Sequence, residues 1–470
     1  MAAVAVNGSE ASSEAPLHVV MFPWFAFGHI SPFVQLANKI GANGARITFL
    51  SAPGNIPRVT AALKTGPGSR IEIVPVLIPP VDGLPPGAES TAEMTPHMAE
   101  LLKLATDKMG PQIETLLADL RPDAVFFDFC MHWLPPIARK LRVKSLFFSV
   151  FSIISTAYLT VPSRLVDVGR RPPTVEEFKR PPPGLEKYDA ADFPSLTSHE
   201  CRDLLYVFKS FGGPSVFDRV TACMETCDAI VAKTCAEMEG PYIEYVRDQY
   251  QKPVHLAGPV VPESPSGELD REWTEWLTRF PEKSVIFCSF GSETFLEYDQ
   301  VKELASGLEM TGSPFILVLN FPDKAETRLR EALPGGFEER VKERGMVKTG
   351  WVQQQLIMAH PSVGYFVCHG GWSSITEALV SDLRLVLLPQ RGDQFLNSKL
   401  VVHNLKAGVE VKRKDEDGFF TRDDLCDAVK TAMAAPKGSQ YWRGFLTNKE
   451  RQDEFVKDLV KEIKETVIKL

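Results

Sequence analysis

Residues 351–394 read WVQQQLIMAHPSVGYFVCHGGWSSITEALVSDLRLVLLPQRGDQ, and this stretch decides the fold of the second half of the chain. The apolar run at 363–367 predicts a buried strand that passes through His369-Gly370-Gly371 into a helix beginning near Trp372. Glycines at such a turn let the backbone approach a ligand closely, and the helix N-terminus offers unpaired N–H groups and a positive dipole end. The turn therefore predicts a phosphate site.

A second apolar run, 385–388, predicts a neighbouring strand that ends in a polar loop carrying Asp393 and Gln394. In open α/β sheets ligands gather at the carboxyl ends of the strands. One strand end is thus suited to phosphate and the next to a group rich in hydroxyls. Together they indicate a nucleotide sugar.

Composition limits the class of protein. With 470 residues, two or three domains are expected, and 44% hydrophobic with 24% charged residues is typical of a soluble globular chain. The net charge of −8 argues against nucleic acid or an anionic membrane as partner. The eight scattered cysteines indicate reduced, buried thiols of a cytoplasmic protein. We also expect the protein to be a monomer.

Two segments could be mistaken for targeting or membrane elements. The N-terminus lacks a basic region and a long apolar run, which favours a flexible tail over 1–16. The apolar stretch 145–161 is interrupted by Ser and Thr, so a strand running into a buried helix is expected and no membrane insertion.

The first half alternates strands and helices. Strands are predicted at 18–22, 46–50, 124–127, 143–148 and 229–231, the last being the final core strand of this half. Helices are predicted near 30–40, 96–109 and 111–120. The proline-rich segment 162–197 predicts a long irregular connection over the surface, of a kind that often shapes a binding cleft.

The alternation of strands and helices restarts after a Pro/Gly/Ser-rich linker at 257–270, with strands predicted at 284–290 and 315–319. The final helix, predicted at 452–469, is amphipathic. The fold class is therefore α/β, with two Rossmann-like doubly wound domains facing a cleft. The predicted domains are 17–256 and 271–440, followed by a C-terminal helical segment, 441–470.

Two polar residues follow strands of the first half. His29, after Gly28, could take a proton from an acceptor hydroxyl, or it could cap the following helix. Asp128 could hold that imidazole in one tautomer, or it could only cap a helix. His132 competes for the role of base, although its place in a helical pattern favours a buried structural histidine.

Other motifs carry less information. Gly291-Ser292 after a strand is a second candidate phosphate loop, whereas the acids at 415–417 stand in a run of mixed charge typical of a solvated loop. Cys223 and Cys227 lack a second pair with zinc-site spacing. No dinucleotide or P-loop motif occurs in the expected context, so no metal and no cofactor is expected.

With these residues assembled, the chain resembles the plant UDP-glycosyltransferases of glycosyltransferase family 1, which are inverting enzymes with the GT-B fold. Residues 351–394 match that family's signature box at its full length of 44 residues, including Trp351, His369, Glu377, Asp393 and Gln394. GHISP near the N-terminus and CDAIVAKTCAEMEG in the middle also match. The resemblance implies that the C-terminal helix packs back on the first domain.

The resemblance also implies roles for single residues. Trp351 would stack on uracil, the backbone at Val352 would read the base edge, and Gln354 and Glu377 would contact the donor, Glu377 at the ribose hydroxyls. His369, Ser374 and Ser292 would bind the diphosphate. Trp372, Asp393 and Gln394 would face the sugar, and Ser373 would contact phosphate or sugar. His29 would be the catalytic base and Asp128 its orienting acid. The UDP-sugar is then a co-substrate.

Three positions depart from the family pattern. Gln353 replaces the usual proline and Gly370 the usual cysteine, which should alter only loop stiffness. Ser373 replaces the usual asparagine, which affects a phosphate or sugar contact and hence the choice of donor.

Several stretches, among them FPWFAFGHISPFVQLANKI and LPQRGDQFLNSKLV, resemble the branch that adds a second sugar to a flavonoid or anthocyanin glycoside. UDP-glucose is the favoured donor because of Gln394, with UDP-xylose or UDP-rhamnose as alternatives. Trp24, Phe25 and Phe27 would suit an aromatic acceptor, or pack in the core. Alternative functions are glycosylation of flavonoid aglycones or of terpenoid or steroid glycosides, and non-catalytic binding of small molecules.

Overall fold

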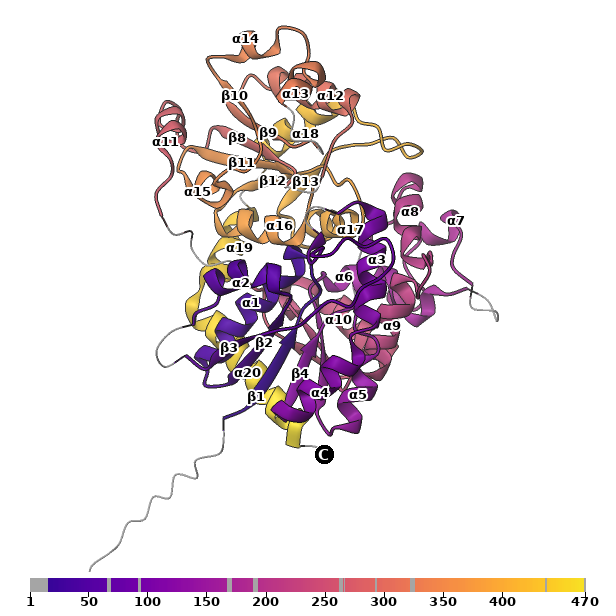
Figure 1. The fold of residues 1–470 in the computed structure, drawn as a ribbon. Coiled ribbons are helices and arrows are strands. Elements are labelled where there is room, and N and C mark those ends of the chain that lie inside the picture. The colour runs from indigo at the N-terminus through magenta and orange to yellow at the C-terminus, as the bar shows by residue number, and fades with distance from the viewer. Residues whose placement is uncertain are drawn as a thin grey trace, which may run out of the picture.

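The computed structural model describes residues 16–65, 69–91, 94–166, 171–188, 193–261, 265, 267–291, 294–321, 326–435 and 438–468. Two parallel sheets form two domains, one above the other in Figure 1. The first sheet has the strand order β3-β2-β1-β4-β5-β6-β7, and the second has the order β10-β9-β8-β11-β12-β13. Each order reverses direction beside its first strand, β1 or β8, as in doubly wound folds, whose ligands bind at that crevice.

The first sheet contains β1 (His18–Phe22), β2 (Arg46–Ser51), β3 (Ile71–Pro75), β4 (Ala124–Phe127), β5 (Lys144–Ser149), β6 (Ala229–Ala232) and β7 (Val254–Leu256). Its helices are α1 (Phe27–Ala42), α2 (Ile56–Ala62), α3 (Pro96–Asp107), α4 (Gly110–Leu120), α5 (Leu134–Lys140), α6 (Ile153–Leu159), α7 (Val175–Phe178), α8 (Ser198–Leu204), α9 (Val216–Thr226) and α10 (Ala236–Tyr250). Short 3₁₀ turns are η1 (Pro53–Asn55), η3 (Pro162–Arg164), η4 (Leu185–Lys187) and η5 (Leu205–Phe208).

The second sheet contains β8 (Val285–Ser289), β9 (Phe315–Leu319), β10 (Gly345–Thr349), β11 (Val363–Cys368), β12 (Arg384–Leu387) and β13 (Gly408–Glu410). Its helices are α11 (Arg271–Leu277), α12 (Tyr298–Met310), α13 (Glu326–Ala332), α14 (Phe337–Val341), α15 (Gln354–Ala359), α16 (Trp372–Val380), α17 (Asp393–Lys399), α18 (Arg422–Ala434) and α19 (Gly438–Thr447). A π-helical turn, η6 (Leu400–Asn404), follows α17, and the chain ends in α20 (Lys449–Ile468).

Strands in the middle of both sheets are continuous apolar runs because helices cover both of their faces. Every residue of β1, β4, β8 and β9 is buried. The segment 145–161 forms β5 and the buried helix α6, as predicted. All eight cysteines are buried and unpaired, which agrees with reduced structural thiols.

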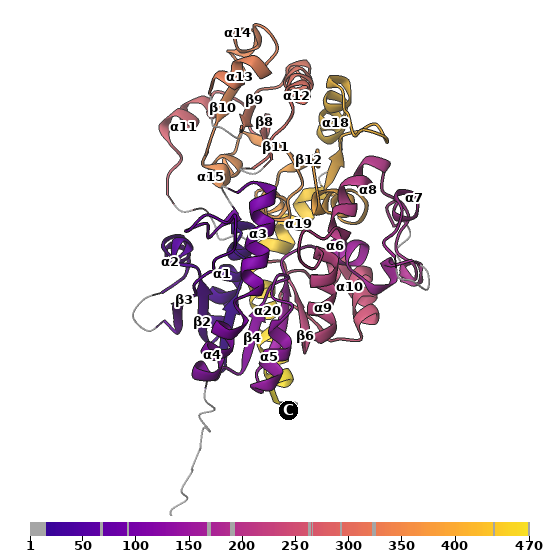
Figure 2. The ribbon, with the colours of Figure 1, turned by 45° about the vertical axis from the view of Figure 1, so that its right-hand side comes forward.

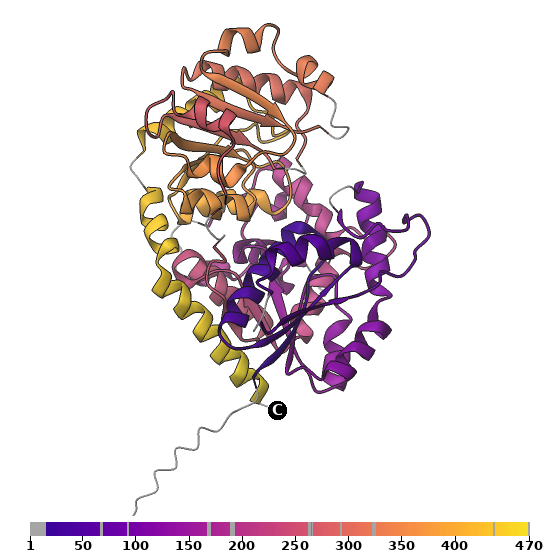
Figure 3. The same cartoon turned by 60° about the vertical axis from the view of Figure 1, so that its left-hand side comes forward.

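The last helix leaves the second domain and returns to the first. Figure 3 shows α20, in yellow, along the side of the first domain. Leu459 and Ile463 are fully buried in the same apolar cluster as Val19 of β1. His255 of β7 also contacts α20, through Glu462 at 3.0 Å and Thr466 at 3.1 Å. The expectation that the C-terminal helix packs on the first domain is confirmed.

Three sequence predictions were wrong in detail. The strand β6 is not the last of the first sheet, because the three-residue edge strand β7 follows it without an apolar run to mark it. His132 lies in a turn before α5 and not inside a helix. Asp393 and Gln394 are the first two residues of α17, because Gly392 (φ 58°) ends the loop before them.

Candidate functional site

The two residues proposed for proton transfer lie side by side at the carboxyl edge of the first sheet. His29 lies in the first turn of α1, and Asp128 directly follows β4. The Nδ1 of His29 is 2.8 Å from Oδ2 of Asp128, and their side chains are 13% and 2% exposed. A carboxylate can only accept, so Nδ1–H donates and Nε2 carries the lone pair that can take a proton.

The carboxylate of Asp128 is held in place by backbone donors. Its Oδ1 accepts a hydrogen bond from its neighbour Phe129 N–H at 2.7 Å, and Oδ2 also accepts from Trp24 N–H at 3.1 Å. The imidazole of His29 is packed between the rings of Phe129 and Phe151, at centroid distances of 5.5 and 5.2 Å. These contacts fix the tautomer and the orientation of the base. The acid does more than cap a helix.

The turn from β11 to α16 has the close approach expected of a phosphate loop. Gly370 has φ 82°, and a Cβ there would lie 2.7 Å from Ser398 Oγ. A Cβ on Gly371 would lie 2.6 Å from Nε2 of His369. Gly370 therefore allows a left-handed backbone conformation and a close contact to Ser398. The sequence had predicted only a change in loop stiffness at this position.

His369 carries a buried nitrogen without a protein partner. Its Nδ1 makes no hydrogen bond to any residue in the described part of the chain. Burial, with a smaller contribution from the charge of Arg391, lowers the pKa of His369 to about 4, so the ring is neutral at physiological pH. Unsatisfied buried polar atoms are rare in native proteins, and one beside the N-terminus of α16 fits a ligand oxygen. Gly291 faces this ring, with its virtual Cβ 3.3 Å from Cε1.

The residues expected to bind the nucleoside lie at one end of the second domain. Trp351 is 86% exposed, so its indole face is open to a nucleobase. Glu377 of α16 accepts hydrogen bonds from Gln354 and Gln355, one on each carboxylate oxygen, both at 2.9 Å. Burial raises the pKa of Glu377, against the effect of these two donors. The carbonyl of Val352 accepts from Gln354 N–H at 2.7 Å.

The residues expected at the sugar lie at the start of α17 and α16. Asp393 accepts from Asn397 Nδ2 at 3.0 Å, and Gln394 Oε1 accepts from the N–H groups of Gln390 and Arg391 at 3.0 and 3.2 Å. Trp372 is 5% exposed, and its ring packs in a core cluster. At the N-terminus of α16, the other predicted contacts are the exposed Ser373 and the half-buried Ser374. Ser292 lies outside the described residues.

The two halves meet across the domain boundary. Asn397 of α17 donates to Gly370 O at 3.1 Å and accepts from Ser152 Oγ, before α6, at 2.6 Å. Burial raises the pKa of Asp393, while the charges of Lys233 and His29, both of the first domain, lower it. The predicted catalytic base, His29, and the predicted sugar contact, Asp393, are therefore brought into one site.

The start of α17 is also held from the first domain. Asp203 of α8 accepts from Gly392 N–H at 2.7 Å, and His199 N–H donates to Asp415 O at 2.9 Å. Figure 2 shows α8 next to the second domain near α18. The acids at 415–417, interpreted as a solvated loop, include this interdomain acceptor.

Of the aromatic residues proposed for the acceptor, Trp24 and Phe25 are only 4% and 1% exposed and belong to the core of the first domain. Phe27 is half-buried, and the guanidinium of Arg58 lies 3.6 Å from its ring centroid. Packing is thus the observed role of the first two. The sequence reasoning missed Lys233, Ser152 and Asn397. Lys233 could have been recognised in the same way as Asp128, because each is a charged residue directly after an apolar strand.

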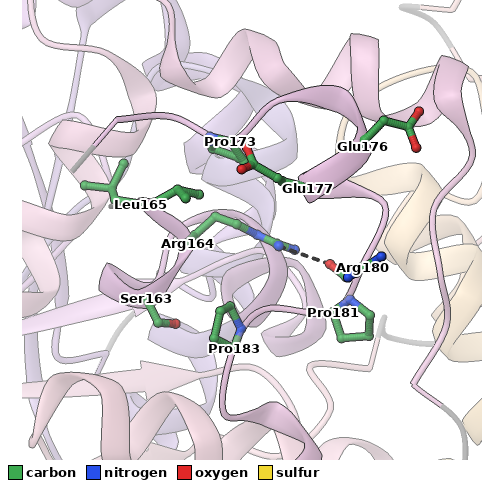
Figure 4. A pocket seen from close by; sticks show the side chains of 10 residues that line it. Ser163, Arg164, Leu165, Pro173, Glu176, Glu177, Arg180, Pro181 and Pro183 are labelled. Atoms are coloured by element: carbon green, nitrogen blue, oxygen red, sulfur yellow. Dashed lines mark hydrogen bonds between the residues drawn. The ribbon is translucent and has the colours of Figure 1, made fainter. Parts of the chain in front are cut away.

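Two cavities differ in their relation to this site. One, of about 500 Å³, lies among Ser163, Arg164 and Glu177 in the proline-rich segment, where Arg164 donates to Arg180 O (Figure 4). None of the predicted site residues lines it, so it is separate from the candidate active site. The other, of about 420 Å³, is lined by both domains, including Asp203, Thr294 and Arg391, and adjoins the start of α17.

In the described part of the chain, no helix has the length and apolar character needed to cross a bilayer. Within the same ranges, no group of three or more His, Cys, Asp or Glu side chains is arranged to hold a metal ion.

Known proteins resemble this chain in sequence and in fold. A family model described as "UDP-glucoronosyl and UDP-glucosyl transferase" matches residues 244–441. The anthocyanidin-3-O-glucoside rhamnosyltransferase of Petunia hybrida is 51% identical over 469 residues, covering 97% of this chain and 98% of that protein. The anthocyanidin 3-O-glucoside 2''-O-glucosyltransferase of Ipomoea nil is 40% identical, covering 96% and 97%.

Among solved structures, Glycyrrhiza uralensis UGT73P12, complexed with glycyrrhetinic acid 3-O-monoglucuronide, superposes with a TM-score of 0.76 at 24% identity. The match covers 96% of each chain and shows the shared fold. The two facing Rossmann-like domains are those of the GT-B fold. The chain belongs to the UDP-glycosyltransferase family, and it is an enzyme that transfers sugars from UDP-sugars.

Proposed function

We propose that this enzyme transfers a sugar from a UDP-sugar to a sugar hydroxyl of a flavonoid glycoside such as an anthocyanidin 3-O-glucoside, with inversion at the anomeric carbon. The observation that carries the proposal is the His29–Asp128 pair, 2.8 Å apart, with the charge of His29 acting on Asp393 of the other domain. The named activities of the Petunia and Ipomoea relatives, both acting on an anthocyanidin 3-O-glucoside, support the choice of acceptor.

The reaction follows from the orientation of the base. Nε2 of His29 takes the proton of the acceptor hydroxyl while Asp128 stabilises the imidazolium that forms. The acceptor oxygen attacks the anomeric carbon and forms a new C–O bond. The bond to the diphosphate breaks, and UDP leaves with its electron pair. Because attack comes from the face opposite UDP, the anomeric configuration inverts.

The charge that develops on the diphosphate needs stabilisation during this step. The N-terminus of α16 supplies backbone N–H groups and a positive dipole end, and the neutral ring of His369 can donate one hydrogen bond. We therefore expect transfer that does not depend on a divalent cation. EDTA should leave the initial rate unchanged, and restoration of an EDTA-suppressed rate by Mg²⁺ or Mn²⁺ would contradict this expectation.

The donor sugar is not fixed by these contacts. Gln394 favours UDP-glucose, whereas the named donors of relatives include rhamnose in Petunia and xylose in Arabidopsis thaliana. A panel of UDP-glucose, UDP-rhamnose and UDP-xylose with one flavonoid glucoside, read by product mass, decides among them.

The acceptor class is tested by comparing three acceptors in separate reactions. Purified enzyme would be incubated with the preferred donor and, separately, cyanidin, cyanidin 3-glucoside and a triterpenoid monoglucoside. We expect a diglycoside from cyanidin 3-glucoside, with the added sugar attached to the first. Conversion of the aglycone or the triterpenoid alone would overturn the proposed acceptor. The His29→Ala variant is the control for enzymatic transfer.

A further inference from the structure

A lysine lies at the same sheet edge as the catalytic pair. Lys233 directly follows β6, which pairs with β5, and β5 pairs with β4, the strand that ends at Asp128. Neighbouring strands lie about 4.8 Å apart, so Lys233 and Asp128 project from positions two strands apart on one edge. The residue is only 5% exposed. It is therefore buried at this sheet edge, where the charge of Asp393 of α17 acts on it.

The ammonium group of Lys233 has no direct partner. Among the residues that the structure describes, carboxylates act on its Nζ through space, without a hydrogen bond. Two other lysines with little exposure are paired: Lys103 contacts Glu100 at 2.8 Å and Tyr206 at 3.0 Å, and Lys399 contacts Glu200 at 3.1 Å and Glu410 at 2.9 Å. Burying a charge is costly, so a ligand oxygen that accepts a hydrogen bond from this ammonium would offset part of that cost.

The charges around Lys233 indicate the kind of ligand. Burial lowers the pKa of Lys233 to about 8, while the carboxylates of Asp393, Glu239 and Asp128 raise it, so the group is mostly protonated at neutral pH. Asp393 contributes most of the three. Because carboxylates outnumber this ammonium, an anionic sugar is disfavoured. A neutral hydroxyl fits, since its oxygen can accept from the ammonium while its hydrogen is donated to a carboxylate.

We propose that Lys233 donates a hydrogen bond to a hydroxyl oxygen of the transferred sugar of the UDP-sugar, opposite Asp393, and so helps to select the donor. This inference rests on the proposed function of the site. Lys233 belongs to the first domain and Asp393 to the second, so the sugar would be held from both sides. The residue positions the sugar and does not transfer a proton.

Binding measurements on the full-length enzyme test this role. Titration calorimetry would compare UDP with the UDP-sugar that the enzyme uses, for the wild type and for Lys233→Met, Lys233→Gln and Lys233→Arg. Loss of a hydrogen bond from a charged donor should weaken UDP-sugar binding about ten- to one-hundredfold and leave UDP binding unchanged. Lys233→Arg should recover part of the loss. The exposed Lys209→Met is the matched control and should bind both ligands as the wild type does.

The oxygen that accepts from Lys233 could instead belong to the diphosphate or to the acceptor, and each case gives a different binding result. Equal weakening of UDP and UDP-sugar would place the lysine at the diphosphate and overturn the proposal. A raised KM for the acceptor with unchanged UDP-sugar affinity would place it at the acceptor and also overturn it. Monodeoxy analogues of the donor sugar locate the contact, because wild type and Lys233→Met should bind the analogue lacking the bonded hydroxyl equally.

Two checks keep the test independent of folding and of the acceptor. Thermal melting identifies any substitution that unfolds the protein, and the remaining two variants then carry the comparison. If the wild type transfers sugar to no flavonoid glycoside, the proposed function fails. The ratio of UDP-sugar to UDP affinity is still measured in that case, so the two failures are distinguishable.

Discussion

At the scale of single residues, the catalytic pair depends on backbone donors as much as on its own hydrogen bond. Asp128 accepts from two backbone N–H groups and from His29, so the carboxylate cannot turn away without losing all three. A base oriented in this way has its free nitrogen in one place before the substrate binds. Such preorganisation is the main contribution of an orienting acid.

Replacing the base tests this assignment. His29→Ala should lower kcat for sugar transfer about 10²- to 10⁴-fold, because the acceptor hydroxyl loses its proton acceptor. UDP affinity should stay within about twofold of the wild-type value, since His29 lies on the other domain from the nucleotide residues. Initial rates and calorimetry measure the two quantities. The exposed His97→Ala should behave as the wild type, and unchanged turnover in His29→Ala would remove His29 from the mechanism.

The sequence was sufficient to predict the candidate catalytic pair but not its surroundings. His29 and Asp128 follow strands, and strand ends of one sheet edge lie together, so their proximity could be expected. Lys233 follows a strand as well, but the charge of Asp393 acts on it only because the two domains meet. The burial of Trp24 and Phe25 depends on how later segments pack, which no local pattern records.

At the scale of elements, α10 carries a buried acid that supports α6. Glu239 lies at a kink in α10, with φ −136° and ψ 22°, and its Oε1 accepts from Ile154 N–H at 2.8 Å. Ile154 is in the first turn of α6, where N–H groups lack intrahelical partners. The acid therefore caps a helix whose N-terminus faces the second domain.

This acid should make stability depend on pH. Burial raises the pKa of Glu239 to about 7 from its usual 4.5, so the folded protein retains a proton that the unfolded chain releases. The unfolding free energy should consequently fall as pH rises from about 4.5 to 7, by up to about 3 kcal/mol. Glu239→Gln keeps an oxygen for Ile154 N–H and cannot ionise, so it should lose this slope.

Urea unfolding at pH 5 and at pH 7.5 measures the difference. Above pH 7 the Glu239→Gln variant should be more stable than the wild type. The exposed Glu237→Gln on the same helix should keep the wild-type slope. Identical slopes for wild type and Glu239→Gln would show that Glu239 ionises as readily as in the unfolded chain.

Element boundaries were predictable where apolar runs were long. The strands β1, β4 and β9 have the predicted limits, and the capping pair Thr421 and Asp424 begins α18, with Thr421 N–H donating to Asp424 at 2.9 Å. The edge strand β7 was missed, because a three-residue strand has almost no sequence signal of its own. Its position is stabilised by α20, more than 190 residues later in the chain.

At the scale of the whole molecule, the interface between domains is polar and buried. Lys399 of α17 lies between Glu410 of its own domain, at 2.9 Å, and Glu200 of α8, at 3.1 Å. Removing one partner of such a group leaves an uncompensated charge. The interface therefore favours one alignment of the two domains. It holds the start of α17 opposite the catalytic pair.

The docking of α20 is the second connection between the domains, and its apolar face should carry most of that stability. Leu459→Ala removes a fully buried side chain and should destabilise the protein by about 2–5 kcal/mol. Thermal unfolding measures the change. Lys464→Ala, on the exposed face of the same helix, should be nearly neutral. Equal effects of the two substitutions would show that α20 does not depend on this face.

The return of α20 also has a consequence for synthesis on the ribosome. The apolar surface of the first domain against which Leu459 and Ile463 pack stays uncovered until α20 has emerged. From Leu256 at the end of β7 to Lys449 at the start of α20 is 449 − 256 = 193 residues. At about 5–20 residues per second, the nascent first domain exposes this apolar surface for roughly 10–40 s. Chaperones that bind apolar surfaces during translation have that interval in which to act.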